Sequence, residues 1–193
     1  MQKIALLIAL FCFGCSAPQE TAPSEWMPIA SRNGEPVYRA ITPKSWIIKK
    51  IDHPVDDTTL PIFEAAIDTV RITVHSFPSD DSSLRIPPRA QVERWKRQVQ
   101  YTESETFWGH GGFIGIIFEG SNPNEKMLAF AMQPGFEQYQ AMLRDPRPLG
   151  RHKRADYTIK AVGTPDAIET NRQDIEHFAN TFELIEEIPL LND

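Results

Sequence analysis

Cysteine is almost absent from this 193-residue sequence, and its two cysteines lie together near the N-terminus, at Cys12 and Cys15. No cysteine follows Cys15. The rest of the chain can therefore form no internal disulfide, no CxxC redox pair and no cysteine-ligated metal site. We expect burial of apolar side chains to stabilise the fold without covalent cross-links.

Apolar runs long enough to cross a bilayer are absent as well. Residues 4–13 are unbroken apolar sequence, but ten residues of helix span roughly half of the ~30 Å hydrocarbon core. Lys3 precedes this run and the small Gly14 follows it. A positive start, a short apolar run and a small residue predict a secretory signal peptide, residues 1–14, which is removed.

The residues at the cleavage point resemble the end of the lipobox of bacterial lipoprotein precursors. Gly14 and Cys15 match its last two positions, whereas Cys12 and Phe13 depart from the first two. The resemblance implies acyl chains on Cys15 and palmitate among them, and more than one chain anchors a protein stably in a bilayer. Ser16 in place of Asp then favours the outer membrane over the inner. The alternative is a secreted protein with a free Cys15.

Excess positive charge is also missing. The chain carries a net charge of −6, and loss of Lys3 with the signal peptide makes it −7. This charge argues against nucleic acid as a partner. Residues 15–34 are rich in Pro, Ser, Ala and Thr and predict a flexible tether, of which residues 26–29 (WMPI) are an exception suited to docking on the domain.

Hydrophobic patterns predict the elements of the folded part. In residues 69–77 (TVRITVHSF), Val70, Ile72 and Val74 alternate with polar residues, which predicts a strand with one apolar face. Helices are predicted over residues 89–101, after Pro88, and from Pro165, with Thr164 as N-cap. Further strands are predicted at residues 37–41, 45–49, 112–119, 126–132 and 157–162. This order predicts an α+β fold with a mainly antiparallel sheet flanked by helices.

Three segments together resemble the PsbP-like family of small secreted and lipoprotein domains. They are residues 42–46 (TPKSW), 92–99 (VERWKRQV) and the helix that ends in 178–182 (FANTF), in an order that covers most of residues 36–186. The resemblance implies a single-domain α/β/α sandwich, here over residues 35–188. It also implies an accessory or binding role without a demonstrated reaction.

The chain departs from the family pattern at residues 133–156, where we expect an inserted amphipathic helix and a basic loop. The helix is predicted from Phe136, Tyr139, Gln140 and Leu143. The loop is the first candidate for a binding surface, for an envelope protein or an anionic ligand. Its residues are Arg144, Arg147, Arg151, His152, Lys153 and Arg154. A solvated loop whose charges meet nearby carboxylates explains the same pattern.

Catalytic patterns are weak. His53 lies among Asp52, Asp56 and Asp57, and His110 lies in the sequence GHGG, but neither spacing matches a known metal motif. Turns explain both segments better. No GxxxxGK[ST], GxSxG or SxxK pattern occurs, so we assign no catalytic residue, metal or cofactor.

These observations predict a non-catalytic binding module, lipid-anchored in the bacterial cell envelope and facing the periplasm. The alternative is a periplasmic metal-dependent hydrolase that uses the loop histidines and acids.

Overall fold

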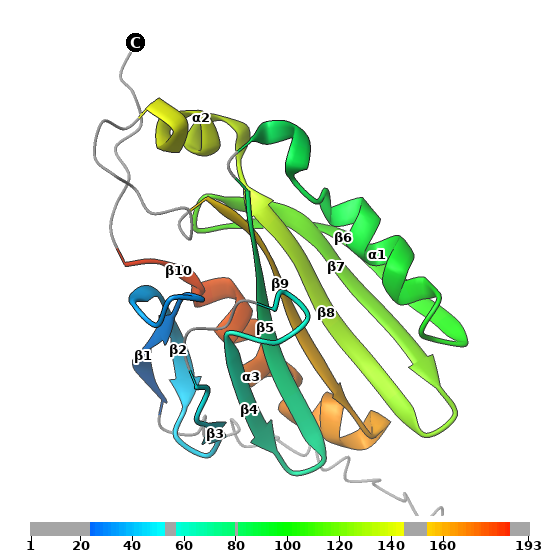
Figure 1. Ribbon diagram of the computed structural model, residues 1–193. Helices are drawn as coiled ribbons and strands as arrows, with labels where there is room; N and C mark the ends of the chain where they lie inside the picture. The colour runs from blue at the N-terminus through cyan, green and yellow to red at the C-terminus, as the bar shows by residue number, and fades with distance from the viewer. Residues whose placement is uncertain (1–23, 53–56, 80, 145–153, 186–193) are drawn as a thin grey trace, which may run out of the picture.

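Two antiparallel sheets make up most of the computed structural model, which describes residues 24–52, 57–79, 81–144 and 154–185. Within these residues the larger sheet has the strand order β3-β4-β5-β9-β8-β7-β6, and the smaller has the order β1-β2-β10 (Figure 1). The strands of the larger sheet are β3 (Ile47–Lys49), β4 (Phe63–Ile67), β5 (Val70–Pro78), β6 (Tyr101–His110), β7 (Phe113–Asn122), β8 (Glu125–Pro134) and β9 (Ala155–Gly163). Those of the smaller sheet are β1 (Ser24–Ala30), β2 (Pro36–Pro43) and β10 (Glu183–Leu184).

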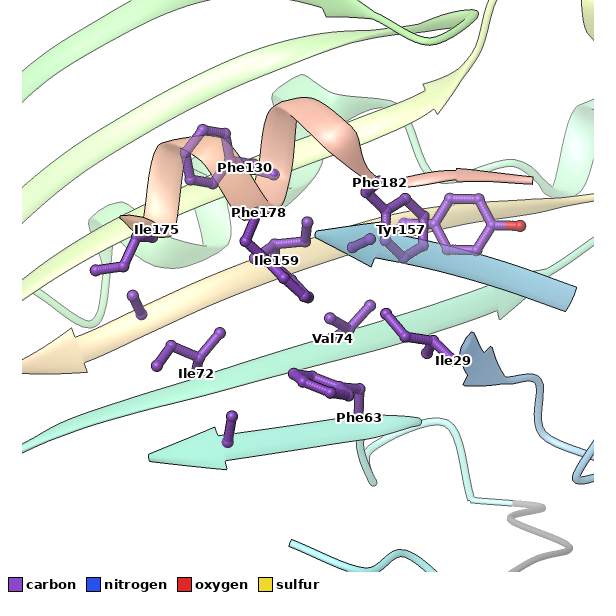
Figure 2. Packing of buried hydrophobic residues seen from close by; sticks show 14 of the residues in the cluster. Ile29, Phe63, Ile72, Val74, Phe130, Tyr157, Ile159, Ile175, Phe178 and Phe182 are labelled. Atoms are coloured by element: carbon purple, nitrogen blue, oxygen red, sulfur yellow. The ribbon is translucent and has the colours of Figure 1, made fainter. Parts of the chain in front are cut away.

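One face of the large sheet packs on α3 (Pro165–Thr181) and on β2. The main core lies here, and Figure 2 shows Phe178 and Ile175 of α3 above the strands. On β5 the apolar side chains Val70, Ile72 and Val74 are all buried on this face, as the alternation in the sequence predicted. The larger buried side chains of the cluster include Tyr38, Phe63, Phe113, Phe130, Tyr157, Ile159 and Phe182.

The opposite face packs on α1 (Pro88–Lys96), which lies over β7 and β8 (Figure 1). Val92 and Trp95 of α1 meet a second, smaller apolar cluster that includes Phe118 and Ala129. Alternate residues of β8 therefore face two different clusters, with Leu128 and Phe130 in the α3 core. This explains the almost continuous apolar sequence of β8, because both of its faces are covered. The predicted α/β/α sandwich with an antiparallel sheet is confirmed.

The segment after α1 differs from its prediction. The helix was expected to continue to Tyr101, but α1 ends at Lys96, and Tyr101 begins β6. The sequence concealed this strand because β6 is an edge strand whose residues are mostly exposed, so they show no apolar alternation. The turn predicted in GHGG is present: Gly111 and Gly112, with φ of +58° and +82°, connect β6 to β7. Positive φ at both positions is what a two-residue type I′ hairpin requires.

The N-terminal boundary also differs from the expected one. Residues 24–34 fell within the predicted tether 15–34, but β1 pairs along β2, where Trp26 faces Ile41. These residues are part of the fold, and Ile29 and Arg32 are buried. The docking allowed for residues 26–29 therefore occurs. The rest of β1 is largely exposed, and an edge strand with one fully buried side chain leaves little periodicity to detect.

The segment after β8 contains α2 (Phe136–Arg144), where a helix was expected. Its buried residues are Tyr139, Ala141 and Met142, whereas Phe136 is exposed, so the buried face is rotated from the predicted stripe. Arg85, just after the short 3₁₀ helix Ser82–Leu84, lies over the Tyr139 ring and donates to the buried Asp156 carboxylate. None of the helices in the described residues is long and apolar enough to cross a membrane.

Candidate functional site

Half of the α1 face of the large sheet is not covered by α1. The helix lies over β7 and β8, and the neighbouring strands β9 and β5 continue the sheet beyond it. On this face β5 presents the polar residues Arg71, Thr73 and His75, which alternate with its buried core residues. On β9, Lys160 pairs with Thr73, and Thr158 pairs with His75. The centre of the sheet thus carries a polar floor beside the helix.

Two cavities of about 330 Å³ and 420 Å³ lie over this floor. They share Arg71, Thr73, Gln98 and Lys160 and so form one continuous depression, which we call the groove. Each volume falls in the range of small-molecule pockets in proteins. The remaining lining residues are Thr58, Thr59, Leu60, Pro61, Thr69, His75, Phe77, Gln91, Arg94, Trp95, Glu125, Met127, Thr158, Val162 and Gly163.

One wall of the groove is the side of α1. Gln91, Arg94, Trp95 and Gln98 all line it. Their spacings of three, one and three residues place Gln91, Arg94 and Trp95 on one side of α1, and Gln98, just after the helix ends, continues that side. Trp95 is buried and contributes to both the wall and the apolar cluster beneath α1, whereas Arg94 is exposed. The same helix therefore covers part of the sheet and borders the part left open.

The opposite wall is the loop of residues 58–61, and a buried arginine holds it in place. Arg32 is 5% exposed and donates to the carbonyl oxygens of Asp57 (2.8 Å), Thr58 (3.3 Å) and Leu60 (3.4 Å). It also donates to the carbonyl of Ser76 on β5, at 2.7 Å from Nη2. These charge-assisted bonds connect the turn after β1 to the wall, which fixes the width of the groove.

Positive charge gathers in the groove. Arg71, Arg94 and Lys160 line it, and Glu125 is the carboxylate among the lining residues. Arg71 also forms a bidentate pair with Glu64, at 3.0 and 3.1 Å. Within the described residues Lys160 has no ion pair or side-chain hydrogen bond. Burial lowers the pKa of Lys160, and the nearby Arg71 and Arg94 lower it further, against an opposing effect of Glu125.

His75 contributes a neutral imidazole to the floor. Its Nε2 donates to the Thr59 carbonyl at 3.2 Å, because a carbonyl oxygen accepts only. Burial lowers the pKa of His75 to about 4, so the ring is uncharged at neutral pH and its Nδ1 is a hydrogen-bond acceptor. The ring also stacks beside Phe77, with 6.5 Å between centroids.

The end of the groove beyond His75 is apolar. Phe77 is the next residue of β5 on this face, and Leu60, Pro61 and Trp95 line the same cavity. Leu60 is one of the exposed large apolar residues of the chain. The groove thus offers cations around Arg71 and Lys160 and apolar surface further along β5. This combination suits binding of an organic anion more than proton transfer, because the one histidine is already hydrogen bonded.

Of the basic residues predicted from the sequence, the two that the structure describes, Arg144 and Arg154, do not line the groove. Arg144 ends α2 and is exposed. Arg154 precedes β9, where its carbonyl accepts from the Ser79 backbone N–H at 2.9 Å. The others, Arg147, Arg151, His152 and Lys153, lie outside the described residues, as does Cys15.

The residues of the alternative hydrolase lie only partly within the described part of the chain. His53 and Asp56 lie outside the described residues, and His110 ends β6 in an exposed position. The Asp57 carboxylate accepts from the backbone and hydroxyl of Thr59, as a turn-forming aspartate does. In the described part of the chain no group of three or more His, Cys, Asp or Glu is arranged to hold a metal ion. Nothing here supports the enzyme alternative.

The sequence contains an indication of the groove in the polar residues of two neighbouring strands. Residues 70–74 alternate apolar and polar, but β5 proved to be an interior strand of the sheet. An interior strand with one polar face requires that face to be open or to meet polar partners. Thr158 and Lys160, which alternate with the apolar Tyr157, Ile159 and Ala161 of β9, give the same indication on the neighbouring strand.

The comparisons with known proteins agree on the fold. No protein-family model matches the chain, and no curated protein matches it. The solution structure of cyanobacterial PsbP (CyanoP) from Synechocystis sp. PCC 6803 matches with a TM-score of 0.50 and 13% identity, over 89% of this chain and 98% of that one. LpqN, involved in cell envelope biogenesis of Mycobacterium tuberculosis, matches with a TM-score of 0.50 and 11% identity, over 83% of this chain and 91% of that one. At such low identity the likeness concerns the fold alone: the chain has a PsbP-like fold.

Proposed function

We propose that this protein is an accessory binding module of the bacterial cell envelope, anchored through lipid on Cys15, and that the groove is its main binding surface. The single observation that carries the proposal is the open, cation-lined half of the α1 face. A partly buried charge without an ion pair costs stability, so Lys160, which has none among the described residues, favours a binding role over a purely structural one. The fold likeness to an envelope-biogenesis protein supports the location, and the run before Cys15 supports the anchor.

Metabolic labelling with palmitate tests the anchor. The wild-type protein should incorporate the label and sediment with membranes, whereas Cys15→Ala should do neither. Cys12→Ala is the matched control, because Cys12 leaves with the predicted signal peptide, and it should behave as the wild type. Equal labelling of the wild type and Cys15→Ala would refute the anchor. Separation of the two membranes by density then tests the expected outer-membrane location.

Photo-crosslinking in living cells tests the groove. Gln98 lines both cavities and is exposed, so a benzophenone amino acid at this position should give a discrete adduct. The same amino acid at Glu93, an exposed residue of α1 outside the groove, should give none. Thr73→Trp, which fills the floor, should abolish the Gln98 adduct. Absence of the Gln98 adduct, or its persistence with Thr73→Trp, would rule out the groove as the binding surface.

The basic segment from Arg144 to Arg154 stays our second proposed contact, for an acidic envelope protein or anionic headgroups. Its support is a concentration of positive charge in an acidic chain. Replacing Arg147, Arg151 and Lys153 by Glu should abolish binding to vesicles that contain phosphatidylglycerol and leave the thermal melt nearly unchanged. Arg154 is left intact because its side chain is partly buried. Unchanged vesicle binding would remove this segment as a contact.

A further inference from the structure

We propose that the groove binds a small amphiphilic anion, with a carboxylate or phosphate group beside Lys160 and Arg71 and an apolar body along Phe77, Leu60 and Trp95. This inference rests on the proposed binding role of the groove and names the class of ligand.

The charge of the lining indicates the sign of the ligand. Arg71, Arg94 and Lys160 bring three positive charges to the groove, against Glu125 in its lining and Glu64, which pairs with Arg71. This excess occurs on a chain whose net charge is −6, so the groove differs in sign from the protein as a whole. Lys160 is partly buried, so water screens its charge less than at an open surface, whereas Arg71 and Arg94 are exposed. An anionic group would offset their mutual repulsion.

The position of Lys160 indicates where the anionic group lies. It is on the floor, in the part that both cavities share, opposite Thr73 on β5. Its ammonium group has three donors, and none has an acceptor in the described residues. Arg71 lines the same shared part, one alternation earlier along β5. A carboxylate or phosphate at this point can accept from both side chains.

The apolar end indicates that the ligand is more than a simple anion. From the shared part, the floor continues along β5 through the neutral His75 to Phe77, between Trp95 of α1 and Leu60 of the loop wall. Covering the apolar surface that is still exposed here, chiefly that of Leu60, lowers the free energy by roughly 25 cal/mol per Å². A free phosphate ion would leave this end uncovered. The cavity volume accommodates a chain or ring of several carbon atoms.

Isothermal titration calorimetry with three probes tests the assignment: octyl phosphate, octan-1-ol and inorganic phosphate. The chain carrying Cys15→Ala is used, so that no attached lipid competes. Octyl phosphate should bind at least tenfold more tightly than either of the others. Octan-1-ol binding as tightly would remove the anionic group from the proposal, and inorganic phosphate binding as tightly would remove the apolar body and indicate a free-anion site.

The same substitution at a lysine inside the groove and at one outside it tests whether Lys160 binds the anionic group. Lys160→Met should weaken octyl phosphate binding at least tenfold and leave octan-1-ol binding unchanged. Lys44→Met removes the same charge from an exposed turn outside the groove and should bind as the unsubstituted chain does. Arg94→Gln, on the exposed wall, provides a second groove variant and should weaken octyl phosphate binding several-fold. Equal affinities of Lys160→Met and Lys44→Met would overturn the proposal.

Calorimetry and crosslinking together distinguish failure of this ligand assignment from failure of the proposed binding role. If the Gln98 adduct forms and octyl phosphate shows no preference, the groove is a binding surface for another class of ligand, and this inference fails alone. If the adduct does not form, the binding role of the groove fails first.

Discussion

Two lysines on opposite faces of the large sheet differ in the partners that they have. Lys126 of β8 lies on the α3 face, where its Nζ is 2.7 Å from Glu103, 2.7 Å from Glu169 and 3.4 Å from Glu119. Lys160 of β9 lies on the α1 face, with no ion pair among the described residues. Burial lowers the pKa of both ammonium groups, but the carboxylates around Lys126 reverse the effect and raise its pKa, whereas that of Lys160 stays lowered.

The two faces of the sheet thus differ in how fully their charged side chains are paired within the protein. On the α3 face the protein satisfies its own charges: Arg172 of α3 pairs with Glu119 on β7, next to the pairs of Lys126. On the open part of the α1 face, Lys160 has no carboxylate paired with it in the described residues. Substitutions on the two faces should therefore have opposite effects on the free energy of unfolding.

The largest effect is expected in the α3 core. Phe178 is fully buried and stacks between the rings of Trp46 and Phe63. Phe178→Ala should lower the free energy of unfolding by about 3–5 kcal/mol, because the lost contacts leave a cavity. Phe107→Ala is the matched control: Phe107 is 85% exposed, and its loss should change stability by less than about 0.5 kcal/mol. Urea unfolding followed by circular dichroism measures both, and similar losses would contradict the assignment of the core.

The next effect is expected at Lys126. Its side chain is 12% exposed, and removing it leaves three carboxylates close together without their shared cation. Lys126→Met should lower the free energy of unfolding by about 1–3 kcal/mol. The pKa values of all three acids are lowered in the fold, that of Glu169 to about 2, so the loss should shrink only as the pH falls below the usual range of a glutamate. An unchanged stability at pH 7 would show that the network contributes nothing measurable.

His75 should make stability depend on pH. Its folded pKa of about 4 lies below the unfolded value of about 6.5, so between these values the unfolded chain binds more protons. Stability present above pH 6.5 is therefore lost as the pH falls toward 4. After discount for partial exposure, the loss from this residue is at most about 2 kcal/mol.

His75→Gln isolates this contribution, since the Gln amide can still donate to Thr59. Unfolding curves at pH 7 and pH 4.5 should show a smaller loss in His75→Gln than in the wild type. Parallel losses would mean that His75 titrates normally and is not buried in the floor.

The smallest effect is expected at Lys160, and its sign is opposite to that at Lys126. Lys160→Met should raise the free energy of unfolding by about 0.5–1 kcal/mol, because it removes a partly buried charge without a protein partner. Because the substitution is the same at both lysines, the opposite signs of the two stability changes compare the two faces directly. A loss of stability in Lys160→Met would show that this charge has a structural role.

Covered strands were predictable from the sequence, and edge strands were not. β7 and β8 carry apolar runs because both of their faces meet apolar clusters, β9 has one face in the α3 core and the other on the groove, and α3 has a Thr-Pro start and a clear stripe. Asn171 interrupts that stripe because it bonds to Ala167 of its own helix and to Asp68. β1 and β6 lie at the edges of their sheets, where few side chains are buried, so their sequences lack a period.

The candidate site was predictable only in part. Alternation in residues 70–75 indicated a polar face, but not whether that face would be covered, because covering depends on where α1 comes to rest. Arg94 and Lys160 are 66 positions apart in the sequence, and no local pattern connects them. The basic residues from Arg144 onward are close together in the sequence and form a visible pattern, whereas the groove is assembled from several segments that lie apart in the sequence.

The buried guanidinium of Arg32 connects the start of the fold to the wall of the groove through its hydrogen bonds. A truncated protein that begins at residue 35, the expected domain boundary, would lack this side chain and leave the carbonyls of Asp57, Thr58 and Leu60 without it. Such a truncation should keep the remaining secondary structure but lose the shape of the recess. Because Arg32 follows shortly after β1 in the chain, a shift of β1 would act on the wall of the recess through these hydrogen bonds.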